Sequence, residues 1–163
     1  MKVALIMGSD SDWEVMSPAV EVLQEFGIET EIVVASAHRT PDKVHDFASG
    51  AAGREVGVII AAAGAAAHLP GVVAAYTTLP VIGVPVNSTS LGGMDALLSI
   101  VQMPSGIPVA CMAINGAKNA GLFAVQILST ASPALQRKLK TYRKTMSDQV
   151  EKKAQKLANK LQG

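Results

Sequence analysis

The sequence predicts an α/β protein of three layers, α/β/α, with a doubly wound parallel sheet and a long C-terminal helix. Short apolar runs alternate with amphipathic segments along residues 1–131 of the 163, the pattern of a parallel sheet covered by helices on both faces. Hydrophobic residues make up 49% of the chain and aromatic residues only 4%, so the core must consist mostly of small aliphatic side chains. A length of 163 residues suits one domain, and we expect residues 1–163 to form it.

The first strand is expected at residues 2–7, "KVALIM", because a nearly continuous apolar run is typical of a central strand covered on both faces. After "GSDSD", apolar residues recur with helical spacing up to Phe26, and Gly27 marks the end of that helix. The same strand and helix pattern then repeats, as in flavodoxin-like and Rossmann-like sheets. Further strands are expected near 28–35, 56–62, 80–84 and 107–113, and further helices near 41–52, 68–77, 92–102 and 117–131.

The segment 133–162 is expected to be one long helix with a single apolar stripe, which runs from Leu135 to Leu161 at intervals of three or four residues. A helix that follows a completed domain has little of its own core left to cover. We therefore expect the stripe to pack on another subunit. The alternative is that the helix folds back across its own sheet.

Composition argues against several classes of partner. Fourteen basic and thirteen acidic residues give a net charge of +1, with no basic stripe for nucleic acid. The apolar stretch 56–76 is broken by glycine, histidine and proline, which does not favour a membrane span. Cys111 is the only cysteine and is expected in the core, so no internal disulfide forms, and we expect a cytoplasmic location.

The loop "GSDSD" is a candidate anion site because it follows the first strand and opens a helix. Gly8 permits a sharp turn, and Ser9 and Ser11 bring hydroxyl groups to the helix N-terminus, where free N–H groups and the helix dipole attract anions. Asp10 and Asp12 would repel a phosphate, a conflict that eases if one carboxylate accepts hydrogen bonds from sugar hydroxyls and the other faces water. The competing interpretation is that Ser11 or Asp12 only caps the helix.

The loop "SAHRTP" follows the second strand and combines a cation with a group that titrates near neutral pH. Thr40 is expected to cap the next helix and Pro41 to begin it, which would fix Ser36, His38 and Arg39 on a short turn. Arg39 can bind a phosphate through two N–H groups, and His38 can exchange a proton. A passive surface role for both residues is the alternative.

The loop "GAAAHLPG" places His68 after residues with no side chain larger than a methyl group. Around Gly64, such residues allow a ligand to approach the backbone closely, although close helix packing explains them equally well. His45 lies in a polar run and is expected on the surface. No dinucleotide or triphosphate loop, nucleophile elbow or metal-ligand spacing occurs in the sequence, so dinucleotide, nucleotide triphosphate and zinc chemistry all lose support.

Together, the motifs "MGSDSDW", "VVASAHRTP", "AAHLPG", "LPVIGVPV" and "SIVQMPSGIPV" resemble the class I N5-carboxyaminoimidazole ribonucleotide mutases of bacterial purine biosynthesis, to about residue 130. The resemblance implies an isomerase, without a metal or an organic cofactor, that moves a carboxylate from the exocyclic nitrogen to ring carbon C4 by decarboxylation and recarboxylation. It also implies a homo-octamer and makes the upstream synthetase a candidate transient partner.

The resemblance also implies roles for individual residues. His38 would be the acid/base group, and His68 would border the pocket that holds carbon dioxide. The substrate would be bound at the phosphate by Ser9, Ser11, Ser36 and Arg39, at the ribose by Asp12, and elsewhere in the pocket by Gly64 and Leu69.

The sequence departs from the family pattern twice. The usual Gly-Gly pair of the carbon dioxide loop is Gly64-Ala65 here, and the turn at 114–120 is shortened to "INGAKNA". A class II enzyme, which carboxylates aminoimidazole ribonucleotide directly, is the nearest alternative, but Arg39 and His68 favour class I. A flavodoxin-like binding module is a further alternative, although "GSDSD" does not resemble a flavin phosphate loop.

Overall fold

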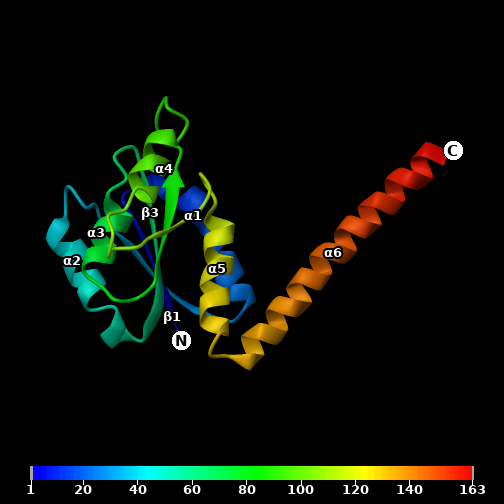
Figure 1. Ribbon diagram of the computed structural model, residues 1–163, viewed down its shortest axis with the longest axis horizontal. Helices are drawn as coiled ribbons and strands as arrows, with labels where there is room; N and C mark the ends of the chain where they lie inside the picture. Colours follow the sequence, from blue (N-terminus) through cyan, green and yellow to red (C-terminus); the bar gives the residue numbers. More distant parts are fainter. Residues whose placement is uncertain (1, 163) are drawn as a thin grey trace.

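Five parallel strands form the centre of the computed structural model, which describes residues 2–162 (Figure 1). Their order across the sheet is β2-β1-β3-β4-β5, the flavodoxin-like order, in which ligands bind at the carboxyl ends of the strands. The predicted fold class is thereby confirmed. The strands are β1 (Lys2–Met7), β2 (Glu29–Val34), β3 (Val56–Gly64), β4 (Val81–Val86) and β5 (Ala110–Cys111).

Helices cover both faces of this sheet, and the alternation of side chains along β1 shows how. Val3, Leu5 and Met7 are buried against α1 (Trp13–Glu25) and α5 (Ala117–Ser129). Ala4 and Ile6 point to the other face, since successive side chains of a strand alternate. That face is covered by α2 (Pro41–Ser49), α3 (Leu69–Ala75) and α4 (Met94–Val101).

Helices α1 and α5 approach each other unusually closely at Gly121. A Cβ atom added to this glycine would lie 2.9 Å from the backbone oxygen of Ala19. Only a residue without a side chain fits at that crossing. The small side chains that dominate the composition therefore serve tight helix packing.

The last predicted strand is the main difference between expectation and structure. Only Ala110–Cys111 pairs with β4, not the expected 107–113. Pro108 cannot donate a backbone hydrogen bond, which delays the start of the strand. Cys111 lies on this edge strand, partly buried and packed against the core, so its expected core position is confirmed in part, and burial raises the pKa of its thiol.

Two further element boundaries differ from the predicted ones. Helix α2 ends at Ser49, with Gly50 as its C-cap, and a 3₁₀ turn, η2 (Ala52–Arg54), replaces its last turn. Strand β3 continues to Gly64, two residues beyond the expected end. These shifts leave the sheet topology unchanged.

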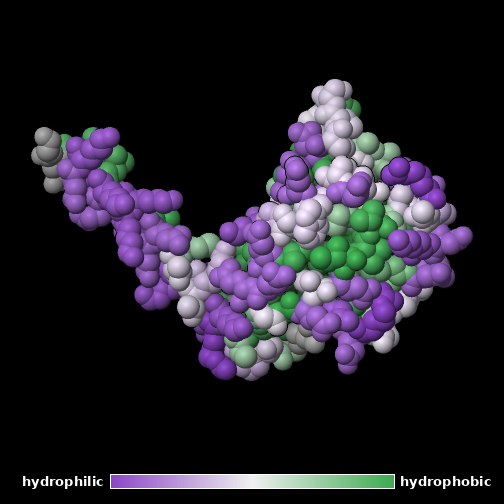
Figure 2. Space-filling view, turned by 180° about the vertical axis from the view of Figure 1, so that it is seen from behind, coloured by the Kyte–Doolittle hydropathy of each residue, from purple (hydrophilic) through white to green (hydrophobic). Residues whose placement is uncertain are grey.

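Helix α6 (Pro133–Gln162) divides into an attached part and a projecting arm (Figure 1). Leu135 is buried, and Leu139 and Tyr142 pack against the core formed by α1 and α5. Beyond these residues the helix extends away from the sheet, largely hydrophilic with scattered apolar side chains (Figure 2). The apolar residues of the arm are exposed, at 45% for Met146, 64% for Val150, 58% for Leu157 and 78% for Leu161.

The first turns of α6 are attached to the domain at Phe26. The side chain of Lys138 donates a hydrogen bond to the backbone oxygen of Phe26 at 2.8 Å, and the rings of Phe26 and Tyr142 lie 5.7 Å apart. The first turns of the helix thus do fold back onto their own domain. Within residues 2–162, every helix is too short or too polar to cross a membrane.

Candidate active site

The loops that follow β1, β2 and β3 meet at the carboxyl edge of the sheet and enclose a small hollow. Its volume is about 310 Å³, and a second hollow of about 360 Å³ adjoins it and shares Gly8, Ser9, Ser36 and Arg39 with it. The structure thus brings the three candidate loops to one place. Six of the expected site residues line the first hollow: Ser9, Ser36, His38, Arg39, Gly64 and Leu69.

The loop after β1 is a tightly hydrogen-bonded helix start. Ser9 is the N-cap of the 3₁₀ turn η1 (Asp10–Asp12), which continues directly into α1. The Ser9 hydroxyl accepts from the N–H of Ser11 at 3.3 Å, and the Asp12 carboxylate accepts from the N–H of Ser9 at 3.1 Å. Ser9 and Asp12 therefore form a reciprocal capping box, and the cap is not Ser11.

Two carboxylates of this loop differ in environment. Asp12 is only 5% exposed, and its burial raises the pKa of its carboxyl group, with a smaller contribution from Asp10, while the N–H groups of Ser9 and Gly8 lower it. Asp10 is exposed, and its carboxylate accepts from the N–H of Ser11 at 3.0 Å and from the Ser9 hydroxyl at 3.2 Å. In the ligand-free chain, Asp10 therefore occupies part of the helix N-terminus that would attract an anion.

The loop after β2 is fixed by Thr40, though not in the way expected. The Thr40 side chain makes no hydrogen bond to the first turn of α2. Instead its hydroxyl accepts from the N–H of Ser36 at 2.9 Å and donates to the Ser36 carbonyl at 3.2 Å. Thr40 is the N-cap residue of α2 and Pro41 begins the helix, both as predicted, but the Thr40 hydroxyl ties residues 36–40 into a closed turn instead of bonding the first turn of α2.

Arg39 lies on this turn and reaches back to the loop after β1. Its guanidinium donates to the carbonyl oxygen of Gly8 at 3.3 Å, and its Nε lies 3.5 Å from the Ser36 hydroxyl. One cation therefore lines the hollow together with Ser9 and Ser36, whereas Ser11 lines neither hollow and donates its hydroxyl hydrogen to the Ser9 hydroxyl at 2.8 Å. Such a group of donors can bind a phosphate at the sheet edge.

The loop after β3 is short and strained. Ala65 has a φ of +53°, in the left-handed region that costs a residue with a side chain about 1 kcal/mol. The N–H groups of Ala67 and His68 then donate to the carbonyls of Ala65 and Ala66, both at 2.8 Å. These two tight turns set the position from which the His68 side chain projects.

The imidazole of His38 lines the hollow and contacts that of His68, which does not line it itself. Nε2 of His38 lies 2.8 Å from Nδ1 of His68, and the rings are nearly perpendicular, at 82°. In such a contact one nitrogen carries the proton and the other accepts it. His45 lies elsewhere, with Nδ1 3.0 Å from a carboxylate oxygen of Asp46 and its ring edge-to-face with that of Tyr76, and its exposed side chain confirms the predicted surface position.

This arrangement can bind an anion at one end and transfer a proton at the other. Arg39 and the serine hydroxyls form the anion end, and the histidine pair stands beside a wall made by Ala63, Gly64 and Ala66. In the part of the chain that the structure describes, no three histidine, cysteine or carboxylate side chains group as metal ligands would. The donor set thus favours acid/base chemistry on a small anionic substrate.

Two further residues support the site and were not among the predicted ones. Ser88 packs on Gly64, since a Cβ atom added to Gly64 would lie 1.9 Å from its hydroxyl oxygen. Asn115 adopts a φ of +56° and holds the end of β4. The "NG" pair in the turn 114–120 is a turn signal that could have pointed to Asn115, whereas nothing in the sequence singles out Ser88.

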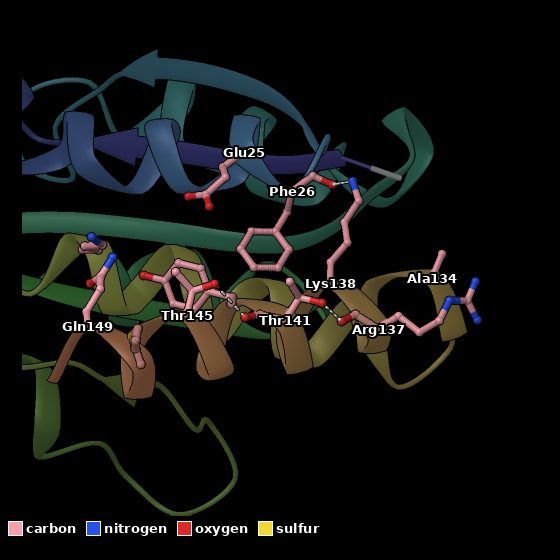
Figure 3. Close-up of a pocket in the computed structure, with 11 residues that line it drawn as sticks. Glu25, Phe26, Ala134, Arg137, Lys138, Thr141, Thr145 and Gln149 are labelled. Carbon is pink, nitrogen blue, oxygen red and sulfur yellow. Dashed lines mark hydrogen bonds between the residues drawn. The ribbon is translucent and has the colours of Figure 1, made fainter. Parts of the chain in front are cut away.

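A larger hollow of about 790 Å³ lies far from these loops, between the end of α1 and α6 (Figure 3). Phe26 and Lys138 flank it, and Lys138 reaches the end of α1 there (Figure 3). Its lining combines basic, hydroxyl and apolar side chains and contains no histidine or cysteine. These side chains offer no proton carrier near neutral pH and suit a contact surface better than a catalytic site.

This chain is similar to known proteins over most of its length. The family model described as AIR carboxylase matches residues 2–149. An N5-carboxyaminoimidazole ribonucleotide mutase of Thermotoga maritima is 56% identical to this chain. The match covers 96% of this chain and 91% of the Thermotoga protein. The mutase of the same name from Mycobacterium tuberculosis is 55% identical to this chain, and the match covers 98% of this chain and 94% of the Mycobacterium protein. The crystal structure of Treponema denticola PurE superposes with a TM-score of 0.85 at 30% identity, covering 95% of this chain and 97% of that one.

Proposed function

Because the chain belongs to the AIR carboxylase family, we propose that it is an N5-carboxyaminoimidazole ribonucleotide mutase. It is an isomerase of purine biosynthesis that converts N5-carboxyaminoimidazole ribonucleotide to 4-carboxy-5-aminoimidazole ribonucleotide. The observation that carries this proposal is the 2.8 Å contact between His38 and His68 beside a wall of small residues. Relatives more than half identical to this chain bear the mutase name.

The phosphate of the substrate binds at the loops after β1 and β2. Arg39 supplies the permanent positive charge, and the hydroxyl groups of Ser9, Ser11 and Ser36 donate to the phosphate oxygens. The shared hollow of Ser9, Ser36 and Arg39, where Arg39 approaches Gly8 at 3.3 Å, supports this assignment, and Ser11 adjoins it through the hydroxyl of Ser9. Asp10 gives up its contacts with Ser9 and Ser11 when the phosphate arrives.

Asp12 binds the ribose hydroxyl groups. One of its carboxylate oxygens already accepts from the N–H of Ser9, which holds the side chain in a fixed orientation. The other oxygen is available to accept from a hydroxyl. This placement puts the imidazole ring of the substrate on the side of His38, with Gly64 and Leu69 beside it.

His38 carries the proton in both halves of the reaction. Its imidazolium protonates the carbamate nitrogen, the nitrogen–carbon bond breaks, and its electron pair stays on nitrogen as carbon dioxide forms. Ring carbon C4 then attacks carbon dioxide, and neutral His38 removes the C4 proton, which restores the imidazolium. A single group can serve as acid and base because the first step leaves His38 neutral, and the proton that it then takes from C4 returns it to the imidazolium.

His68 holds His38 in the required tautomer. If Nδ1 of His68 accepts from Nε2 of His38, the Nε2 proton stays in place throughout, and Nδ1 of His38 is the nitrogen that exchanges a proton with the substrate. The 2.8 Å distance between the two nitrogens supports this division of roles. His68 thus orients the acid/base group rather than losing or gaining a proton itself.

Carbon dioxide is held between the two steps by the loop after β3. Gly64, Ala65 and Ala66 offer no side chain larger than methyl, so a small apolar molecule can lie against the backbone. Confinement keeps the molecule next to C4 at a high effective concentration. The reaction is an isomerisation with no net oxidation or reduction, so it needs no electron carrier. The proposed steps use neither a metal nor an organic cofactor.

The proposed enzyme acts as a cytoplasmic homo-octamer in which residues 1–131 form the catalytic core. The exposed apolar residues of α6 beyond Tyr142 support a contact with a neighbouring subunit, as does the mixed hollow beside Phe26 and Lys138. Residues 133–162 would then serve assembly. The upstream synthetase is a transient partner that delivers the unstable carbamate.

The test is to offer the purified protein two substrates without metal or ATP. Conversion of N5-carboxyaminoimidazole ribonucleotide at low bicarbonate is expected. No comparable product should form from aminoimidazole ribonucleotide and bicarbonate at the same concentration. Preference for the second substrate would instead identify a direct carboxylase, and turnover of neither would leave a binding module.

A further inference from the structure

Asn115 holds the end of strand β4 from both sides. Its backbone N–H donates to the carbonyl of Pro85 at 2.8 Å, and its side-chain oxygen accepts from the N–H of Asn87 at 2.9 Å. Pro85 and Asn87 flank Val86, the last residue of the strand. The φ of +56° at Asn115 lets one residue make both contacts, and asparagine tolerates this conformation better than most residues.

Ser88 follows Asn87 directly and lies against the carbon dioxide loop. Gly64 pairs with Val86 in the sheet register, so the two chain segments leave the sheet side by side. A Cβ atom added to Gly64 would lie 1.9 Å from the Ser88 hydroxyl oxygen and 3.1 Å from the Val86 carbonyl. The Ser88 side chain therefore fills the space that a side chain at position 64 would occupy.

Gly64 in turn begins the loop that presents His68. The strained Ala65 and the two tight turns at Ala67 and His68 follow directly. A displacement of Gly64 would therefore reach both the small-residue wall and the contact between His68 and His38. The phosphate site lies on other loops, after β1 and β2, and would be left in place.

We propose that Asn115 is a positioning residue for the carbon dioxide pocket, acting through Asn87 and Ser88 on Gly64. This inference rests on the proposed mutase function. These contacts hold Gly64 in place, so the pocket stays closed between the two steps of the reaction. Ring carbon C4 then captures the released carbon dioxide. When the hold is lost, carbon dioxide escapes and the uncarboxylated aminoimidazole ribonucleotide is released.

The experiment compares Asn115→Gly with Asn115→Asp in single-turnover reactions of N5-carboxyaminoimidazole ribonucleotide, after subtraction of the enzyme-free breakdown. Glycine keeps the left-handed backbone and its N–H but removes the side-chain acceptor, whereas aspartate keeps an acceptor oxygen. For Asn115→Gly, the ratio of uncarboxylated to carboxylated product should rise about fivefold, as expected for the loss of one ordinary hydrogen bond. The KM should stay unchanged, and Asn115→Asp should partition like the wild type.

Ser88→Gly provides a second, independent variant, because it removes the side chain that lies on Gly64 and leaves Asn115 intact. It should raise the same product ratio. All reactions are run below the unfolding temperature of each variant, so that lost stability alone does not change the ratio. Wild-type partitioning in both Asn115→Gly and Ser88→Gly would overturn the proposal, while a wild-type enzyme that converts no substrate would overturn the proposed function instead.

Discussion

Nε2 of His38 lies 2.8 Å from Nδ1 of His68, so each ring has one nitrogen engaged with the other ring and one nitrogen free. His68→Ala should lower kcat about tenfold to a hundredfold, because His38 loses the partner that fixes its tautomer, much as loss of a supporting residue does at other sites. His68→Asn, which offers an acceptor oxygen, should retain more activity. Steady-state kinetics on both variants measure this, and equal losses would rule out a role for the acceptor.

His38→Asn should leave the fold intact and lower kcat by about 10²–10⁴, the range for loss of a positioned acid or base. Asparagine keeps the approximate shape of the side chain but cannot carry a proton. His45→Asn is the matched control, since His45 is exposed and remote from the hollow, and it should show wild-type rates. Near-normal turnover of His38→Asn would remove His38 from the mechanism.

Asp12→Asn should change the pH dependence of stability. Burial raises the pKa of Asp12 in the folded chain above its usual value of 3.8, so the folded state holds this proton more tightly than the unfolded state. The stabilisation is fully present below pH 3.8 and is lost as the pH rises through the folded pKa, by about 1.4 kcal/mol for each unit of pKa difference.

Urea unfolding of both proteins between acidic and neutral pH measures this effect. The wild type should lose stability relative to Asp12→Asn as the pH rises, and the difference should then level off. All other titrating groups are common to the two proteins and cancel. A wild type that gains stability over the variant with rising pH would contradict the assigned cause.

Asp10→Asn should lower the KM for the ribonucleotide. The Asp10 carboxylate occupies the N–H of Ser11 and the hydroxyl of Ser9 and must leave when a phosphate binds. Removing one exposed negative charge beside the phosphate is expected to strengthen binding severalfold, corresponding to about 1 kcal/mol, and less at high salt. Titrations at two ionic strengths measure both changes, and a raised KM would show that Asp10 assists binding.

The double variant Val150→Glu, Leu157→Glu should reduce the mass of the assembly. Both residues lie on the exposed apolar stripe of α6, and burying a charge in a subunit contact is costly. Lys152→Glu, Lys156→Glu is the control, because these exposed residues lie outside the stripe and change charge by a larger amount. Light scattering compares the masses, and an unchanged mass in the stripe variant would exclude this subunit contact.

The sheet topology and the three loops of the site could be predicted from the sequence because local patterns encode them. Apolar runs marked the strands, and the rule that ligands bind at strand ends brought His38 and His68 to one edge. The other features of the site depend on which of several competing contacts a side chain makes in the folded structure. The Thr40 hydroxyl binds Ser36 instead of the first turn of α2, and the support that Asn115 and Ser88 give to Gly64 depends on strand register, which no local pattern specifies.

The close crossing of α1 and α5 at Gly121 and Ala19 has a consequence for synthesis of the chain. The three catalytic loops all belong to the first 69 residues and leave the ribosome early. The part of the apolar face of α1 that packs on α5, however, stays uncovered until residues 117–129 have emerged. The nascent chain must therefore carry a nearly complete set of site residues on an unfinished core, exposed to aggregation or to chaperones, until more than two thirds of it has been made.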